Sequence, residues 1–81
     1  MNNPKDPAMY PIGVVEERTG LTGRQIRYYE KMGLISPSRT SGKQRRYTEA
    51  DINILLKIKK HIQDGLDIKD IKKILHELKR E

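Results

Sequence analysis

The feature that most constrains the fold is the stretch over residues 22–33, which reads Thr-Gly-Arg-Gln-Ile-Arg-Tyr-Tyr-Glu-Lys-Met-Gly. Thr22 can cap a helix N-terminus, and Gln25, three residues further on, has the spacing of a capping box. Gly33 is the residue type that commonly follows a helix in a positive-φ conformation. The stretch therefore predicts a short helix with two defined ends.

The two faces of this predicted helix differ in chemistry. Residues three and four positions apart share a face, and one face here carries Arg24, Arg27, Tyr28 and Lys31. The opposite face is apolar, with Ile26 and Tyr29. Guanidinium groups suit guanine edges and phosphates, and a phenol suits a phosphate or a thymine methyl. The pattern is typical of a helix that lies in a DNA major groove; the alternative is a solvated surface helix.

The residues before this stretch complete a recognisable motif. A first helix is predicted from about Gly13 to Thr19, and it would bury Val14 and Val15 together with Ile12. A helix this short is stable only when it packs on a neighbour. Gly20-Leu21 forms the turn that leads into the cationic helix. A helix, a short Gly-containing turn and a cationic second helix indicate a helix-turn-helix, which favours DNA binding.

A polar segment follows the cationic helix. Leu34-Ile35 is predicted as a short apolar strand, and Ser36 to Tyr47 as a hairpin with Ser41-Gly42 as its turn. The charged residues of this segment are all cationic: Arg39, Lys43, Arg45 and Arg46. Such a hairpin is typical of a wing, which contacts the phosphate backbone or places an arginine in a minor groove. The alternative is a solvated loop. Tyr47 is expected in the core or at a hinge rather than as a base-stacking platform.

Two more helices are predicted in the C-terminal half. Thr48 and Asp51 again have capping-box spacing, at the start of a helix that runs to about Gln63. Its apolar residues cover about half of its circumference, so it should be central; they are Ile52, Ile54, Leu55, Leu56, Ile58 and Ile62. Gly65 ends it, and Asp67 precedes a last helix. That helix has a narrow apolar stripe of Ile68, Ile71, Ile74, Leu75 and Leu78, and its outer lysines are expected to be a solubilising surface.

Composition limits the remaining possibilities. The chain has 81 residues, a net charge of +6 and no cysteine, which indicates one small domain with a polyanionic partner and no disulfide or thiolate metal site. We expect a flexible N-terminal segment over residues 1–9 and the domain over residues 10–81. His61 and His76 each stand alone, so we expect no metal. No catalytic grouping stands out, so we expect no cofactor and no enzyme. The lack of cysteine favours a cytoplasmic location. No apolar run is long enough for a membrane span, and the N-terminus has no signal-peptide core.

Several segments together resemble the N-terminal DNA-binding domain of MerR-family transcription regulators, over essentially Tyr10 to Leu78. They are Ile12-Gly13-Val14-Val15, Thr19-Gly20-Leu21, Arg24-Gln25-Ile26-Arg27-Tyr28-Tyr29-Glu30, Gly33-Leu34-Ile35, Arg45-Arg46-Tyr47 and Asp51-Ile52. The resemblance implies a mainly α fold, in which a winged helix-turn-helix with a short β-hairpin wing is followed by two further helices. It also implies a homodimer on a palindromic double-stranded DNA element in the bacterial cytoplasm, associated with the nucleoid.

The resemblance also implies site residues. Arg24 and Tyr28 match contacts of the family's recognition helix to bases and nearby backbone, and Arg27 matches a phosphate contact. The full set expected on the recognition helix is Thr22, Arg24, Gln25, Arg27, Tyr28 and Lys31. The set expected on the wing is Arg39, Lys43, Arg45, Arg46 and Tyr47.

Within the family, the sequence is most similar to the subgroup of glutamine synthetase repressors, which implies a repressor of nitrogen-assimilation genes. That subgroup contacts glutamine synthetase through a C-terminal tail, which this sequence does not include. Most family members also carry a dimerisation helix and an effector-binding region after this domain, so we expect a shortened form. We further expect a monomer or a weak dimer in solution that pairs on its palindrome.

Two other functions fit the same sequence. One is a phage excisionase-like architectural protein, which would bind adjacent sites and bend DNA. The other is a helical protein-interaction module that docks through the apolar stripe of the last helix. Binding to a single palindrome distinguishes the regulator from the interaction module, and DNA bending on tandem sites distinguishes it from the architectural protein.

Overall fold

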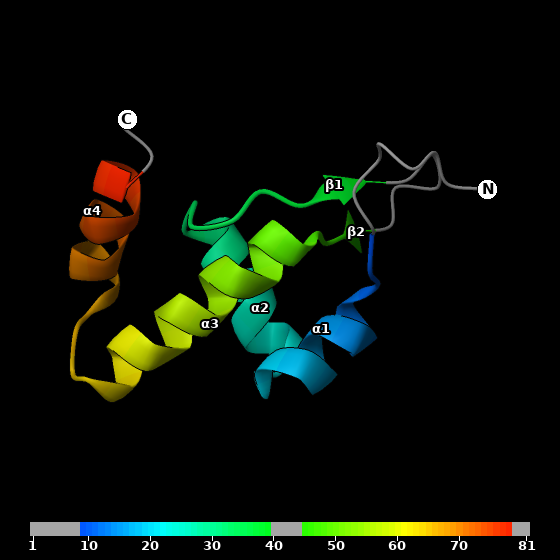
Figure 1. The fold of residues 1–81 in the computed structure, drawn as a ribbon, viewed down its shortest axis with the longest axis horizontal. Coiled ribbons are helices and arrows are strands. Elements are labelled where there is room, and N and C mark those ends of the chain that lie inside the picture. The colour runs from blue at the N-terminus through cyan, green and yellow to red at the C-terminus, as the bar shows by residue number, and fades with distance from the viewer. Residues whose placement is uncertain (1–8, 40–44, 79–81) are drawn as a thin grey trace.

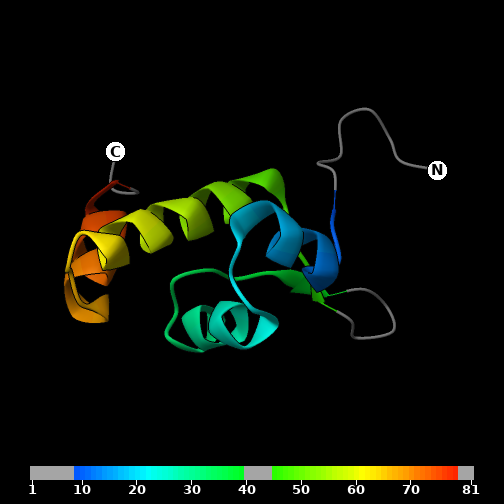
Figure 2. The same cartoon turned by 90° about the horizontal axis from the view of Figure 1, so that it is seen from below.

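The computed structural model describes residues 9–39 and 45–78, which form four helices and two short strands (Figure 1). The helices are α1 (Ile12–Thr19), α2 (Gly23–Lys31), α3 (Glu49–Gln63) and α4 (Ile68–Leu78), and the strands are β1 (Ser38–Arg39) and β2 (Arg45–Arg46). The long helix α3 crosses the molecule, with α4 beside its C-terminal end and the strands near its N-terminal end (Figures 1 and 2). The predicted mainly α class is confirmed.

Helix α2 begins and ends where the sequence predicts. The Thr22 N–H donates to Gln25 Oε1 at 3.0 Å, and the Gln25 N–H donates to Thr22 Oγ1 at 3.1 Å, which completes the capping box. Gly33 follows the helix with φ +83°, and Gly20 forms the turn after α1 with φ +76°. Positive φ is strained for residues with a Cβ, so these two glycines fix the turns on either side of α2.

Helices α3 and α4 also start at their predicted caps. The Thr48 N–H donates to Asp51 Oδ2 at 2.9 Å, and the Asp51 N–H donates to Thr48 Oγ1 at 3.2 Å. The Asp70 N–H at the start of α4 donates to Asp67 Oδ1 at 2.9 Å. Each cap satisfies backbone N–H groups that have no partner within the helix. The caps therefore define where these two helices begin.

The core is centred on α3, as its wide apolar face predicts. α3 contacts α1 and α4. Its Ile52, Leu55 and Ile58 are fully buried. Each such side chain contributes about 1.5–3 kcal/mol relative to the exposed state. The other fully buried apolar side chains come from the surrounding elements: Val15, Ile26, Tyr47 and Ile71. Leu56 and Ile62 remain exposed, so the apolar face of α3 is not covered completely.

The prediction of a strand at Leu34-Ile35 is wrong. Both residues are buried, at 3% and 4% exposure, but they lie in irregular chain between α2 and β1. Their side chains fill the core while no strand among the described residues pairs with their backbone. Two apolar residues are too few to distinguish a strand from a buried loop by periodicity.

The strands themselves lie within the segment predicted as a hairpin. β1 pairs with β2 in antiparallel register, with Ser38 opposite Arg46 and Arg39 opposite Arg45. The predicted turn at Ser41-Gly42 lies outside the described residues.

The start of the described chain is attached to the end of the hairpin. The Tyr10 N–H donates to the Tyr47 carbonyl at 2.7 Å, and the Tyr47 N–H donates to the Tyr10 carbonyl at 2.8 Å. The segment predicted to be flexible, residues 1–9, lies outside the described residues except for Met9. None of the described helices is long and apolar enough to cross a membrane.

Candidate nucleic-acid interface

The structure brings the predicted cationic residues together on the outer face of α2. Arg24, Arg27, Tyr28 and Lys31 are all exposed, and Tyr28 keeps 48% of its surface accessible. On the opposite face Ile26 is fully buried, which anchors the helix to the core. The four exposed residues comprise three cations and a phenol, without a carboxylate among them. The face therefore presents positive charge that an external anion can meet.

The two adjacent tyrosines of α2 have different roles. Their ring centroids are 5.7 Å apart in an edge-to-face arrangement. Burial, and then the charge of Tyr28, raise the pKa of the Tyr29 phenol above its ordinary value. Tyr29 therefore remains a neutral core residue at physiological pH, and it supports the exposed Tyr28 ring from behind.

Thr22 and Gln25 stand at the exposed start of α2, and both side chains take part in the capping box. Their first role is thus to begin the helix. A DNA contact from the Thr22 hydroxyl would have to share an atom that already accepts the Gln25 N–H. The Gln25 amide nitrogen takes no part in the box, so it can still face a ligand.

The residues predicted on the hairpin are placed less uniformly. Arg39 and Arg45 lie in the paired strands, Arg46 is half-buried, and Lys43 lies outside the described residues. Tyr47 is fully buried. Its ring packs in the core, as the residue pattern suggested, and it does not reach the surface where the family resemblance implies a wing contact.

The interactions that hold α1 against its neighbours were not predicted from the sequence. Glu16 Oε2 accepts the Gly23 N–H at the start of α2, and Lys59 Nζ on α3 donates to the Thr19 carbonyl at 2.8 Å. Lys59 thereby binds a carbonyl at the C-terminal end of α1, where a cation is favoured. Partners on different elements leave no periodic signal in a sequence, so only the geometry reveals them.

A second set of side-chain interactions joins α1 to the start of α3. The Arg18 guanidinium donates to both carboxylate oxygens of Glu49 and lies 5.6 Å from the centroid of the Tyr10 ring. The Arg18 hydrogen bond is the main reason that the pKa of Glu49 lies below its ordinary value, and the pKa of Arg18 is raised by the same bond. The Glu49 carboxylate thus binds Arg18. The Asp51 carboxylate accepts the Thr48 N–H in the cap of α3.

Comparison with known proteins shows to which family this chain belongs. The model for MerR HTH family regulatory proteins matches residues 10–78. The chain belongs to the MerR family. This confirms the resemblance seen in the sequence, and it places the chain among regulatory proteins rather than enzymes.

Two curated MerR relatives have the same level of identity to this chain. The transcriptional regulator GlnR of Bacillus anthracis is 45% identical over 67 residues, which cover 83% of this chain and 52% of GlnR. The transcriptional regulator TnrA of Bacillus subtilis (strain 168) is 45% identical over 69 residues, which cover 85% of this chain and 63% of TnrA. The chain therefore spans roughly half of GlnR and somewhat more of TnrA. The similarity to GlnR and to TnrA is thus equal in identity.

A solved MerR structure has the same fold. It is described as HiNmlR, a MerR family regulator lacking the sensor domain, bound to promoter DNA. The TM-score is 0.80 at 27% identity, and the match covers 85% of this chain and 53% of that one.

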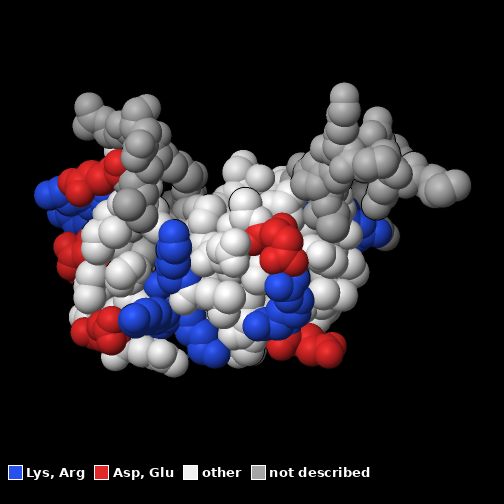
Figure 3. Space-filling model, in the orientation of Figure 1, with Lys and Arg blue, Asp and Glu red and all other residues white. Residues whose placement is uncertain are grey.

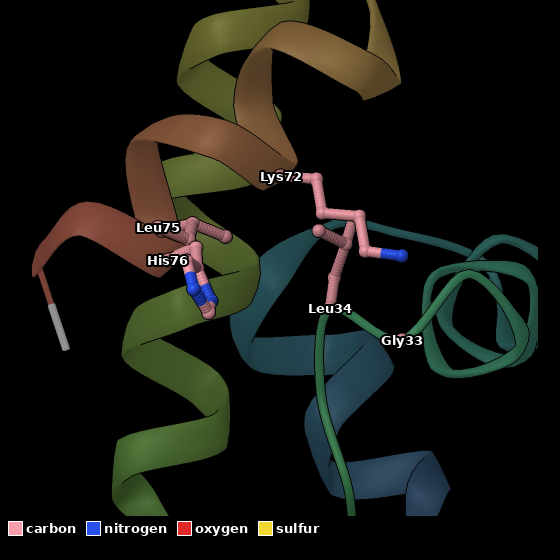
Figure 4. Close-up of a pocket in the computed structure, with 5 residues that line it drawn as sticks. All are labelled: Gly33, Leu34, Lys72, Leu75 and His76. Atoms are coloured by element: carbon pink, nitrogen blue, oxygen red, sulfur yellow. The ribbon is translucent and has the colours of Figure 1, made fainter. Parts of the chain in front are cut away.

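The structure also contains a small pocket between the end of α2 and α4. It is lined by Gly33, Leu34, Lys72, Leu75 and His76, and Lys72 extends toward Gly33 (Figure 4). Its volume of about 70 Å³ suits a few water molecules rather than a cofactor. The described residues contain no group of three or more potential metal ligands.

Proposed function

We propose that this chain is the sequence-specific, double-stranded DNA-binding part of a bacterial transcription regulator, with α2 as its recognition helix. The observation that carries the proposal is the exposed face of Arg24, Arg27, Tyr28 and Lys31. That face lies on a helix fixed by its capping box and by the buried Ile26 behind it. A rigid element is what precise recognition requires, because base contacts tolerate little displacement.

The position of each side chain suggests its role. Arg24 lies in the first turn of α2, and the first residues of a recognition helix contact base edges in the helix-turn-helix geometry. Arginine pairs with two acceptors of guanine in the major groove. Arg27, Tyr28 and Lys31 lie further along the helix and suit the phosphate backbone, which contributes affinity without sequence information.

We further propose that the β1–β2 hairpin acts as the wing. It follows α2 in the chain and has cations in both strands, at Arg39, Arg45 and Arg46. Lys43 lies between the strands in the sequence and adds a further positive charge to the segment. These residues would contact phosphates beside the major-groove site, which fits the net charge of +6.

The biological role that we propose is repression of nitrogen-assimilation genes, including those for glutamine synthetase. The support is the 45% identity to GlnR and to TnrA, at the same level in both. We also propose that two copies bind a palindromic operator, because symmetric regulators place two recognition helices about one helical turn apart.

Selection of bound duplexes from a random DNA pool tests the proposal. The expected result is one enriched palindrome, which also occurs upstream of glutamine synthetase genes in the source genome. Affinity for this operator should fall when one half-site is scrambled, because the second copy no longer benefits from effective concentration. A pool without enrichment would contradict sequence-specific binding, and equal affinity for operator and single half-site would contradict the dimer.

The structure argues against the protein-interaction module but does not distinguish the regulator from the excisionase-like architectural protein. Ile71 and Leu75 in the apolar stripe of α4 are buried against the core, and Ile68 and Ile74 are half-buried, so Ile71 and Leu75 are not available for docking another protein. The excisionase-like alternative keeps the same DNA-binding face. Circular permutation of the selected site, followed by gel mobility, distinguishes it by the bending that it predicts on tandem sites.

A further inference from the structure

A carboxylate of helix α1 forms a hydrogen bond with the start of the recognition helix. Glu16 Oε2 accepts the N–H of Gly23, the first residue of α2, at 2.6 Å in a half-buried position. A bond this short between a carboxylate and a backbone N–H is of the charge-assisted kind. It also places negative charge at a helix N-terminus, where the helix dipole favours it.

This bond satisfies one more backbone N–H group at the start of α2. The first four N–H groups of a helix have no partner within it. Those of Thr22 and Gln25 are satisfied inside the capping box, and that of Gly23 by Glu16. The capping box is local to α2, whereas Glu16 belongs to α1. Among these three bonds, the one from Glu16 ties the N-terminus of α2 to another element.

Gly23 provides the space for this contact. A Cβ at that position would lie 3.2 Å from Glu16 Oε2, 3.4 Å from Ile12 Cδ1 and 3.5 Å from Arg27 Nη1. The first distance is tighter than an ordinary van der Waals contact, so a side chain here would displace the carboxylate. The Glu16 carboxylate and the Arg27 guanidinium thus both lie close to the position that a Cβ of residue 23 would occupy.

We propose that Glu16 is a positioning residue that sets the angle of the recognition helix against α1, and thereby the discrimination between operator and other DNA. The proposal rests on the function proposed above. Glu16 holds the turn of α2 that carries Arg24, so loss of the bond lets that turn shift while the buried Ile26 still anchors the middle of the helix. A base contact suffers from such a shift more than a phosphate contact, because it requires closer geometry.

Two substitutions distinguish the effect of the length of the Glu16 side chain from the effect of its charge. Glu16→Asp keeps the charge but is one methylene too short for the Gly23 N–H. Glu16→Gln keeps the length and an accepting oxygen but removes the charge. Glu17 is the matched control, since it is the next residue of α1, is exposed and has no hydrogen bond to α2 among the described residues. Glu17→Asp and Glu17→Gln repeat both changes without the bond.

The measurement is the affinity of each variant for the selected operator and for a random duplex, by fluorescence anisotropy, with thermal melting as the folding check. Glu16→Asp should reduce the ratio of the two affinities by about five- to tenfold, a part of what one bidentate base contact supplies. Its affinity for random DNA should not change. Glu16→Gln should keep most of the ratio and bind both duplexes more tightly, because a negative charge near the phosphates is gone. Both Glu17 variants should keep the wild-type ratio.

The alternatives have distinct outcomes. A wild-type ratio in Glu16→Asp would overturn the inference, and so would a ratio abolished in Glu16→Gln but kept in Glu16→Asp, since charge rather than the bond would then act. If Glu16→Asp does not fold, the protection of the Gly23 amide proton from solvent exchange in Glu16→Gln decides: loss of that protection, with the ratio still at its wild-type value, would overturn the inference. A wild-type protein that shows no preference for any sequence would contradict the proposed function itself, and the inference would fall with it.

Discussion

Helices α2 and α4 have the same general design and differ in what they expose. Each packs an apolar stripe on the core, through Ile26 in α2 and Ile71 in α4, and each turns basic residues outward. The outer face of α2 has two arginines, a tyrosine and a lysine. The outer face of α4 has lysines interspersed with Asp70 and Glu77. Amphipathic character with basic residues therefore does not by itself mark a DNA-reading helix.

The difference lies in the chemistry of the exposed groups. Arginine has a planar fork of donors that matches guanine and phosphate, whereas lysine is a strongly hydrated point charge. Mixed charges are also what an ordinary solvated surface has. The face over α3 in Figure 3 has such a mixture of acidic and basic side chains. The outer face of α4 resembles that surface, and the outer face of α2 does not.

The largest expected effect concerns what the two helices share. Ile71→Ala on α4 should lower the free energy of unfolding by about 2–5 kcal/mol, because it leaves a cavity in the core. The preference of the folded protein for its operator should not change. Urea unfolding of this variant and of Ile62→Ala, at an exposed position of α3, measures the difference. An equal effect of both substitutions would show that α4 does not belong to the core.

The next effect separates the helices. Arg24→Ala on α2 should weaken operator binding by about 1–3 kcal/mol more than random-DNA binding, because it removes the guanidinium that we propose pairs with a base. Lys73→Ala on α4 removes the same charge and should leave that difference unchanged. Titrations of both duplexes with both variants provide the measurement. Equal weakening on operator and random DNA would make Arg24 a phosphate contact only.

A third effect concerns the hairpin. Replacement of Arg45 and Arg46 together by glutamine should reduce affinity and flatten its salt dependence, by about 0.9 in log–log slope for each phosphate that the wing no longer neutralises. The same double replacement at Lys69 and Lys73 of α4 should leave the slope at its wild-type value. Lower affinity with an unchanged slope would indicate a folding defect, and the wing assignment would then be wrong.

The smallest effect is expected away from both outer faces, at the pair of Arg18 and Glu49. The pKa of Glu49 lies below its ordinary value of 4.5, so the pair stabilises the folded state above that pH and loses this contribution as the pH falls through the lower, folded-state pKa. Both side chains are about half exposed, so the effect is weakened by solvent. Thermal melting of wild type and Glu49→Gln should differ slightly at pH 7 and converge in acid. A difference that grows in acid would contradict this sign.

The sequence predicted what depends on neighbouring residues. The capping boxes at Thr22 and Thr48, the positive-φ Gly33 and the division of α2 into two faces all follow from spacings of three or four residues. The strand at Leu34-Ile35 was wrong, because two buried residues have no measurable period. The bond from Glu16 to Gly23 and the pair of Arg18 and Glu49 could not be predicted. They depend on how α1 packs on α2 and α3, which no local pattern specifies.

We propose that the outer face of α2, and not that of α4, reads the operator. The most direct test is a titration of ¹⁵N-labelled protein with the selected operator and with a scrambled duplex, followed by backbone and arginine Nε–H resonances. We expect the operator, unlike the scrambled duplex, to shift the Arg24 Nε–H resonance and the backbone resonances of the first turn of α2. Lys69 and Lys73 should show only small shifts with either duplex. Operator-specific shifts confined to α4, with α2 unchanged, would contradict this proposal.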